Sequence, residues 1–241
     1  MKIRPRFFSA IVSATCAGNK PDFCCITMTS DFDMAAVTAR LATGLDATGI
    51  ELSPEQVDRL VRLLAELSKW NRTYNLTAVR DPQEMVARHL LDSLSALAFV
   101  VGERVLDVGT GAGLPGIPLA VARPQQHFTL LDSIGKKQHF VTHVAGMLGL
   151  ANVEAVQARV EEFIPSVLFD TVICRAFSSL TDFVSSSGRL IKPGGRLVAM
   201  KGKLPAEELA ALPADWQVLE TVPVSVPGLS GERHIVVLQS R

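Results

Sequence analysis

A glycine-rich segment with the sequence DVGTGAGLPG, which begins at Asp107, has the composition of a ligand-binding loop. It follows a short apolar run typical of a strand and precedes a segment with helical character. Glycine lets the backbone turn tightly and approach a ligand without an intervening side chain. Asp132 closes the next predicted strand, where a carboxylate accepts hydrogen bonds from ribose hydroxyl groups. Together these residues predict a site for a ligand that contains a nucleoside.

The spacing of the glycines fits two kinds of ligand. Asp107-x-Gly109-x-Gly111-x-Gly113 resembles the first motif of class I methyltransferases, which use S-adenosylmethionine (AdoMet). Gly111-x-Gly113-x-x-Gly116 equally matches a dinucleotide fingerprint, so an NAD(P)-dependent oxidoreductase is the alternative. The acid before the glycines, a Lys-Pro-Gly-Gly-Arg turn before a later strand, and two final strands without a helix between them favour the methyltransferase.

The second half of the chain predicts the elements that position this loop. Short apolar strands alternate with helices, which implies a parallel sheet covered on both faces. The expected strands are 105–108, 128–131, 153–156, 171–174 and 196–200, and the expected helices are 115–122, 134–148 and 179–191. Two last strands, 216–222 and 234–239, have no helix between them. We therefore predict an α/β, Rossmann-like fold of the class I AdoMet-dependent methyltransferases, with a mostly parallel seven-stranded sheet, a C-terminal antiparallel hairpin and N-terminal helices.

The first half reads as amphipathic helices. A modest helix is expected over 34–45, and Ser53-Pro54-Glu55-Gln56 is a strong helix start, because Ser53 can cap and Gln56 can reach back to its amide. Asp81-Pro82-Gln83-Glu84 repeats this logic, and an apolar stripe with Met85, His89 and Leu94 follows. The predicted organisation is an unstructured extension over 1–32, a helical segment over 33–100 and a methyltransferase domain over 101–241. The basic and then apolar start of the extension also faintly resembles a secretory signal peptide.

Composition limits the class of protein. Hydrophobic residues make up 48% of the 241, which excludes a wholly disordered chain. No apolar run reaches the roughly 18 residues that a membrane-spanning helix needs. The cysteines lack the spacing of a zinc site or disulfide framework, which favours a reducing compartment and a cytoplasmic protein; they are Cys16, Cys24, Cys25 and Cys174.

The net charge of zero, from 24 basic and 24 acidic residues, is unevenly distributed. Residues 59–88 carry six basic and three acidic residues, a net +3, and residues 171–203 carry six basic and one acidic, a net +5. Residues 204–232 carry five acids and no base. We therefore expect a local basic face, with salt-sensitive RNA binding, on a neutral protein.

An ordered set of motifs spans residues 50–240: WNxxYNLT from Trp70, RHLLDS from Arg88, GTGAGLPGIP from Gly109, LDS from Leu131, RAF from Arg175, KG at Lys201 and ERH from Glu232. Together they closely resemble the GidB (RsmG) family of bacterial 16S rRNA guanine-N7 methyltransferases. The resemblance implies AdoMet as methyl donor and the guanine at position 527, in the 530 loop of 16S rRNA, as target. It also implies 16S rRNA as partner, within the 30S subunit or an assembly intermediate. A non-catalytic RNA-binding assembly factor that kept the fold is a further alternative.

Candidate residues for the methyl donor follow from position and from this resemblance. Loop position suggests Gly109, Gly111 and Leu114, and the ribose is assigned to Asp132. The segment after the third strand, where class I folds usually meet the adenine, contributes Val160 and Glu161. The resemblance supports the set Gly109, Leu114, Val160, Glu161 and Arg175.

Four further residues are candidates for positioning the target base or its phosphates: Arg88, His89, Lys201 and Arg233. Guanine N7 carries an in-plane lone pair and no proton, so we expect no catalytic acid or base and no metal. The alternative for His89 is a buried, hydrogen-bonded side chain, and for Arg175 a salt bridge. Trp70 and Tyr74 could stack on RNA or pack in the core.

Overall fold

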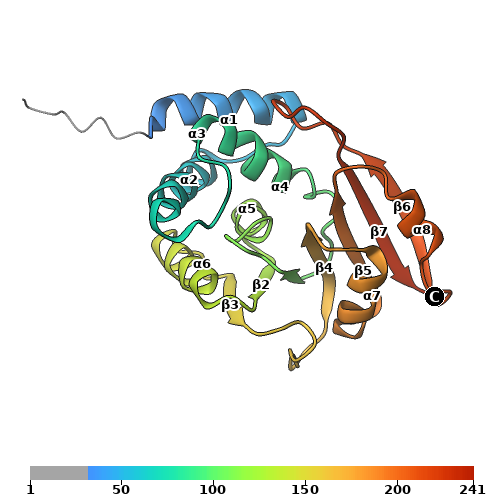
Figure 1. Ribbon diagram of the computed structural model, residues 1–241. Helices are drawn as coiled ribbons and strands as arrows, with labels where there is room; N and C mark the ends of the chain where they lie inside the picture. The colour runs from blue at the N-terminus through green and yellow to red at the C-terminus, as the bar shows by residue number, and fades with distance from the viewer. Residues whose placement is uncertain (1–31) are drawn as a thin grey trace, which may run out of the picture. The chain divides into compact units, whose positions relative to one another are not determined.

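The computed structural model describes residues 32–241, which form one compact unit (Figure 1). The predicted extension over 1–32 and its resemblance to a signal peptide therefore lie, apart from Phe32, outside the described residues. The N-terminal part is helical, with α1 (Met34–Thr48), α2 (Pro54–Tyr74), α3 (Pro82–Met85), the π-helical turn η1 (Val86–Leu91) and α4 (Asp92–Leu94). Within the described residues, none of the helices combines the length and hydropathy that crossing a membrane requires.

The start of α2 forms as the sequence predicts. The Gln56 amide donates to Ser53 Oγ at 3.2 Å, and the Ser53 amide donates to Gln56 Oε1 at 2.8 Å, which completes a capping box. Gln56 Nε2 also donates to the carbonyl of Val121 at 2.8 Å. This cap therefore fixes α2 against the end of α5 (Gly116–Ala122) as well as starting the helix.

The third predicted helix is interrupted. Residues 82–94 follow one helical path, but η1 occupies its middle, and the Asp92 amide bonds to the Ala87 carbonyl five residues back. Ser93 Oγ donates to the His89 carbonyl, the acceptor that an α-helix gives to the Ser93 amide. This competition widens the turn, and π-helical turns are frequent at functional sites.

All seven predicted strands are present in residues 32–241. They are β1 (Arg104–Val108), β2 (His127–Asp132), β3 (Val153–Gln157), β4 (Phe169–Arg175), β5 (Ile191–Lys201), β6 (Trp216–Pro223) and β7 (His234–Ser240), in the spatial order β3-β2-β1-β4-β5-β7-β6. The pairs among β1 to β5 are parallel, and β7 is antiparallel to both β5 and β6. The predicted fold class is confirmed.

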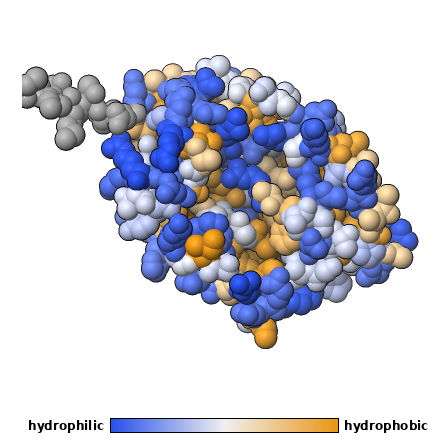
Figure 2. Space-filling model, viewed as in Figure 1, coloured by the Kyte–Doolittle hydropathy of each residue, from blue (hydrophilic) through white to orange (hydrophobic). Residues whose placement is uncertain are grey.

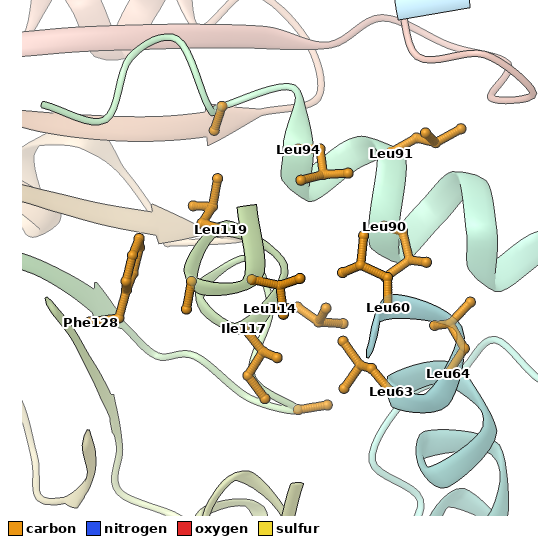
Figure 3. Close-up of a cluster of buried hydrophobic side chains, with 14 of the residues drawn as sticks. Leu60, Leu63, Leu64, Leu90, Leu91, Leu94, Leu114, Ile117, Leu119 and Phe128 are labelled. Atoms are coloured by element: carbon orange, nitrogen blue, oxygen red, sulfur yellow. The ribbon is translucent and has the colours of Figure 1, made fainter. Parts of the chain in front are cut away.

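Helices cover both faces of this sheet (Figure 1). On one face, α1 to α5 and α6 (Gly135–Met147) share a core with the sheet, and Figure 3 shows Leu60, Leu90 and Leu114 of that core pointing toward one another. On the other face, α7 (Leu180–Ser187) packs with Leu209 of α8 (Ala206–Ala210). Burying apolar side chains on both faces is what makes these strands nearly continuous in hydrophobicity.

Two local predictions differ from the structure. The helix expected over 179–191 ends at Ser187 and continues as a 3-10 turn, Gly188–Leu190. The Lys-Pro-Gly-Gly-Arg segment lies inside β5, where the pairing with β4 shifts between Phe169 and Thr171. Gly194, with φ of +79°, lies in the unpaired part of that bulge.

Candidate functional site

A cavity of about 350 Å³ lies at the carboxyl ends of β1, β2 and β3. We call it the glycine-loop pocket, and its lining residues are Val108, Gly109, Leu131, Asp132, Ser133, Ile134, Lys137, Ala158, Arg159, Val160, Glu161 and Phe177. The chain runs from β1 to β2 and β3 on one side and returns to β4 on the other, so this edge is the topological switch point. Open α/β sheets bind ligands at such a point. Four predicted site residues, Gly109, Asp132, Val160 and Glu161, meet here.

The backbone of the glycine loop is held by the buried Asp107. Its Oδ2 accepts from Thr110 Oγ1 at 2.6 Å and from the Gly116 amide at 2.8 Å. A side chain at Gly116 would meet Leu130 and this carboxylate at less than 3.0 Å, so a larger residue here would force both to move. Gly109 has φ of +69°, and a Cβ there would meet no atom within 4 Å. The open space beside Gly109 is what lets a ligand approach the backbone.

Burial raises the pKa of Asp107 to about 6, although the bonds from Thr110 and Gly116 lower it. Its second oxygen, Oδ1, is buried and has no hydrogen-bond partner within residues 32–241. A desolvated carboxylate with one unpaired oxygen favours its protonated form. The residue is therefore close to its titration midpoint in mildly acidic solution.

Asp132 fixes the floor of the pocket. Its Oδ2 accepts from the Gly111 amide at 3.0 Å and from Lys137 Nζ at 3.3 Å, and its Oδ1 accepts from the Ile134 amide at 2.9 Å. A carboxylate has about four acceptor positions, so one is left for a hydroxyl group. Asp132 thus braces the glycine loop and has one acceptor position left over.

Val160 and Glu161 form the opposite wall of the pocket. Both of their carbonyls accept from Arg189 Nη2, at 2.6 Å and 2.9 Å. Arg189 lies in the 3-10 turn after α7, so an element of the other sheet face fixes this wall. The sequence offered no motif that would identify this contact.

The other cofactor candidates lie outside the lining of the pocket. Leu114 is 3% exposed and packs in the core, and its amide donates to the Thr110 carbonyl at 2.8 Å. The Gly111 amide contributes through Asp132. Arg175 points to α4 instead, which corresponds to the salt-bridge alternative.

Arg175 belongs to a second group, which we call the arginine cluster: Arg88, Asp92, Arg175 and Arg233. Asp92 accepts from Arg175 Nη1 at 3.3 Å through one oxygen and from Arg233 Nε at 3.1 Å through the other. Arg175 Nη1 also donates to the Arg88 carbonyl at 3.1 Å. The Arg88 guanidinium pairs with Glu84 on the surface. The cluster therefore joins the side chains of Arg175 and Arg233 at one nearly buried carboxylate, and Arg88 takes part through its backbone carbonyl.

His89 follows Arg88 in η1 and is 5% exposed. Its Nε2 is 3.0 Å from Thr77 Oγ1, while Nδ1 is buried without a partner among residues 32–241. Burial, with the nearby charge of Arg175, lowers the pKa of His89 to about 4. A neutral, buried His89 matches the structural alternative and links the loop after α2 to η1.

Lys201 lies away from the arginine cluster. Its ammonium pairs with Glu208 of α8 at 2.8 Å and donates to the Phe177 carbonyl at 3.3 Å. Glu208 also accepts from the Leu180 amide at 2.7 Å. Phe177 lines the glycine-loop pocket, so the bond to its carbonyl links Lys201 to the pocket indirectly.

The family model for GidB, described as rRNA small subunit methyltransferase G, matches residues 56–236. Two relatives named ribosomal RNA small subunit methyltransferase G, from Escherichia coli O17:K52:H18 and Nitrosococcus oceani, are each 50% identical over 83% of this chain, and the match covers 97% and 94% of their lengths. The chain belongs to the rRNA small subunit methyltransferase G family. A solved structure of the mitomycin 7-O-methyltransferase MmcR superposes with a TM-score of 0.56 and 16% identity, over 89% of this chain and 74% of that one, and shares the fold.

Membership of the methyltransferase G family confirms the predicted family, the methyltransferase class and AdoMet as methyl donor. The roles of individual residues stay predictions. Lys137 also lines the pocket and was not among the predicted site residues. Lys137 follows Asp132 by five residues in the first turn of α6, a spacing that could have indicated the pair. Within residues 32–241, no cluster of three or more His, Cys, Asp or Glu side chains could hold a metal ion.

Proposed function

We propose that this protein transfers a methyl group from AdoMet to N7 of the guanine at position 527, in the 530 loop of 16S rRNA. The observation that carries the proposal is the family match over most of the chain, 50% identical to relatives named for small subunit rRNA methylation. The substrate is the 30S subunit or an assembly intermediate, in the cytoplasm. Residues 33–100 act as a helical segment attached to a methyltransferase domain over 101–241.

The glycine-loop pocket fits AdoMet. Its volume of about 350 Å³ is within the range of small-molecule sites. Gly109 leaves the backbone open, Asp132 keeps an acceptor position for a ribose hydroxyl, and Val160 and Glu161 supply the wall for the adenine. Bound there, AdoMet supplies an electrophilic methyl group on a sulfonium.

The reaction requires the protein to align the methyl donor with the target base more than to transfer a proton. Guanine N7 attacks with its own lone pair, so no side chain needs to remove a proton. The guanidinium groups of Arg88, Arg175 and Arg233 are suited to hold phosphates or the base of the target nucleotide. Asp92 orients two of them, and Lys201 positions Phe177 at the edge of the pocket.

Mass spectrometry of 16S rRNA from cells with and without the gene tests this proposal. We expect N7-methylguanine at the 530 loop to disappear with the gene and to return when the gene is restored. Its retention in the deleted strain would overturn the proposal. Calorimetry with AdoMet and NAD separates the methyltransferase from the oxidoreductase, and RNA binding without methyl transfer would favour the assembly factor.

A further inference from the structure

The C-terminal end of α2 carries a small aromatic surface, which we call the aromatic ledge: Trp70 and Tyr74. The two rings lie 5.2 Å apart with an interplanar angle of 35°. Tyr74 is 43% exposed, whereas Trp70 is partly buried. Of the two predicted alternatives, the exposed Tyr74 is free to stack on RNA, whereas Trp70 packs against the core.

Trp70 is a fixed support for the exposed ring. Its indole Nε1 donates to Glu66 Oε1 at 2.9 Å. The centroid of its ring lies 5.5 Å from that of Phe140 and 5.2 Å from that of His143. Glu66 in turn is 3.0 Å from His143 Nε2. A support fixed on three sides holds Tyr74 in place, so a ligand that stacks on it would not first have to order the side chain.

The end of α2 is also fixed. Asn75 takes a left-handed conformation, with φ of 49°, and ends the helix directly after Tyr74. Asn71, 2% exposed, accepts from the Thr77 amide at 2.9 Å and donates to the Val79 carbonyl at 3.3 Å. The loop that borders the ledge is thereby tied back to the helix that carries it.

Basic side chains lie on the segments that carry and border the ledge, where Lys69 pairs with Glu66 and Arg80 donates to Asn75 Oδ1. Lys136 Nζ donates to the Tyr74 carbonyl at 3.0 Å. Lys69 and Arg80 are exposed on the same stretch of chain, where residues 59–88 carry a net +3. An exposed aromatic ring among positive charges is the combination with which proteins bind unpaired nucleotides, because every base offers a face for stacking and a phosphate for pairing.

The first turn of α6 links the ledge to the glycine-loop pocket. Lys136 and Lys137 are neighbours in the first turn of α6, and they contact Tyr74 and Asp132 respectively. Ile134, at the start of the same helix, lines the pocket and is 42% exposed. A nucleotide on the ledge would therefore lie beside the pocket in which the methyl donor is proposed to bind. Figure 2 shows hydrophilic residues mixed with small hydrophobic patches on the visible face, without one large apolar surface that would indicate a protein partner.

We propose that the aromatic ledge binds an unpaired RNA nucleotide next to the target guanine, with its base stacked on Tyr74 and its phosphate near Lys136. This inference rests on the proposed function, since it makes rRNA the ligand of the same edge of the molecule. It adds a contact outside the glycine-loop pocket and the arginine cluster.

The test compares Tyr74→Leu, which keeps apolar bulk over Trp70 but removes the aromatic face, with Tyr74→Trp, which keeps that face. Leu219→Ala is the matched control, because Leu219 is also 43% exposed but lies on β6, at the far edge of the sheet from α6. The probes are unmethylated 30S subunits and a single-stranded RNA with the 530-loop sequence. Affinity for both probes, KM and kcat for the subunits, and the Kd of AdoMet are measured.

We expect Tyr74→Leu to weaken RNA binding about tenfold and to raise KM in proportion, with kcat and the AdoMet Kd unchanged. Tyr74→Trp should retain wild-type affinity, and Leu219→Ala should change nothing. Lys136→Gln should reduce the slope of log affinity against log salt concentration by about one. Equal RNA affinities for Tyr74→Leu and wild type would overturn the inference.

The RNA-binding readout separates this inference from the proposed function. If the wild-type protein transfers no methyl group but Tyr74→Leu still loses affinity, the proposed function fails and the ledge stands. If methyl transfer proceeds and Tyr74→Leu matches wild type, the ledge fails and the function stands. A loss of affinity for AdoMet in Tyr74→Leu would assign Tyr74 to the methyl-donor site and would also count against the ledge.

Discussion

The glycine-loop pocket and the arginine cluster use carboxylates in opposite ways. At the glycine-loop pocket, Asp107, buried beneath the loop, and Asp132, in the lining, accept hydrogen bonds mainly from backbone amides, at Gly111, Gly116 and Ile134. In the cluster, Asp92 accepts from the guanidinium groups of Arg175 and Arg233. The first arrangement fixes the path of the chain, and the second fixes the direction of side chains.

The two regions also differ in how far their partners are separated along the chain. Gly111 and Asp132 are 21 residues apart, whereas Asp92 and Arg233 are 141 apart. The glycine loop and Asp132 therefore come from one strand-loop-helix unit and the next strand, and residues 158–161 and Phe177 complete the pocket. The cluster forms only after α4, β4 and the start of β7 have come together, so its geometry depends on the complete fold.

The largest expected effect is on stability, from Asp92→Asn. The side chain of Asp92 is 9% exposed and neutralises two guanidinium groups that are themselves 25% and 28% exposed. Removing the charge leaves both cations partly desolvated, so we expect the free energy of unfolding to fall by about 3 kcal/mol. Urea unfolding at neutral pH measures this change.

Glu84→Gln is the control for that variant. Glu84 pairs with Arg88, but both side chains are almost half exposed, and such pairs contribute less than about 1 kcal/mol. Similar losses in Asp92→Asn and Glu84→Gln would show that the cluster is not held together by its carboxylate.

The two regions should respond oppositely to pH. Burial lowers the pKa of His89, beside the cluster, from 6.5 to about 4, so between these values only the unfolded state is protonated and stability rises with pH. Burial raises the pKa of Asp107, in the pocket, from 3.8 to about 6, so only the folded state is protonated in that window and stability falls with pH. Each shift corresponds to about 3 kcal/mol, and the two oppose one another.

Single variants reveal the two slopes. We expect Asp107→Asn to leave a protein whose stability rises between pH 4 and 6.5, and His89→Gln to leave one whose stability falls between pH 4 and 6. Urea unfolding at steps of half a pH unit measures both. The same slope in the two variants would contradict the opposite shifts.

The contrast between the regions also explains what the sequence could predict. All seven strands were predicted because short runs rich in apolar residues are a strong local signal, even in β3 and β6, which are not buried on both faces, whereas α8 was missed because none of its residues is buried. Gly109 and Asp132 could be found from strand-loop-helix order. The partners of Arg175, Arg233 and Lys201 could not, since they come from distant segments.

A smaller effect is expected from Asp132→Ala, on affinity for AdoMet. The variant removes the acceptor position for the ribose and also releases the Gly111 amide and Lys137. We expect the AdoMet Kd to rise about thirtyfold, about 2 kcal/mol, with RNA affinity unchanged. Calorimetry measures the first and filter binding the second, with Asp58→Ala, on the exposed surface of α2, as control. A change under about 1 kcal/mol would remove the ribose contact from the proposal.

The smallest expected effect concerns Arg189, which reaches the glycine-loop pocket from the other face of the sheet. Its guanidinium donates to the carbonyls of Val160 and Glu161, which lie 29 and 28 residues earlier in the chain. Arg189→Lys keeps the charge but loses the planar group that spans both carbonyls. We expect the AdoMet Kd to rise about fivefold, about 1 kcal/mol, because the wall formed by Val160 and Glu161, where the adenine is proposed to lie, loosens. Arg59→Lys, on α2 and outside the lining of the pocket, is the control for a change of basic group, and should leave the Kd as it is. If Arg189→Lys also binds AdoMet like wild type, the sheet alone holds the wall. The pocket would then depend, like the glycine loop, only on contacts between segments close in sequence.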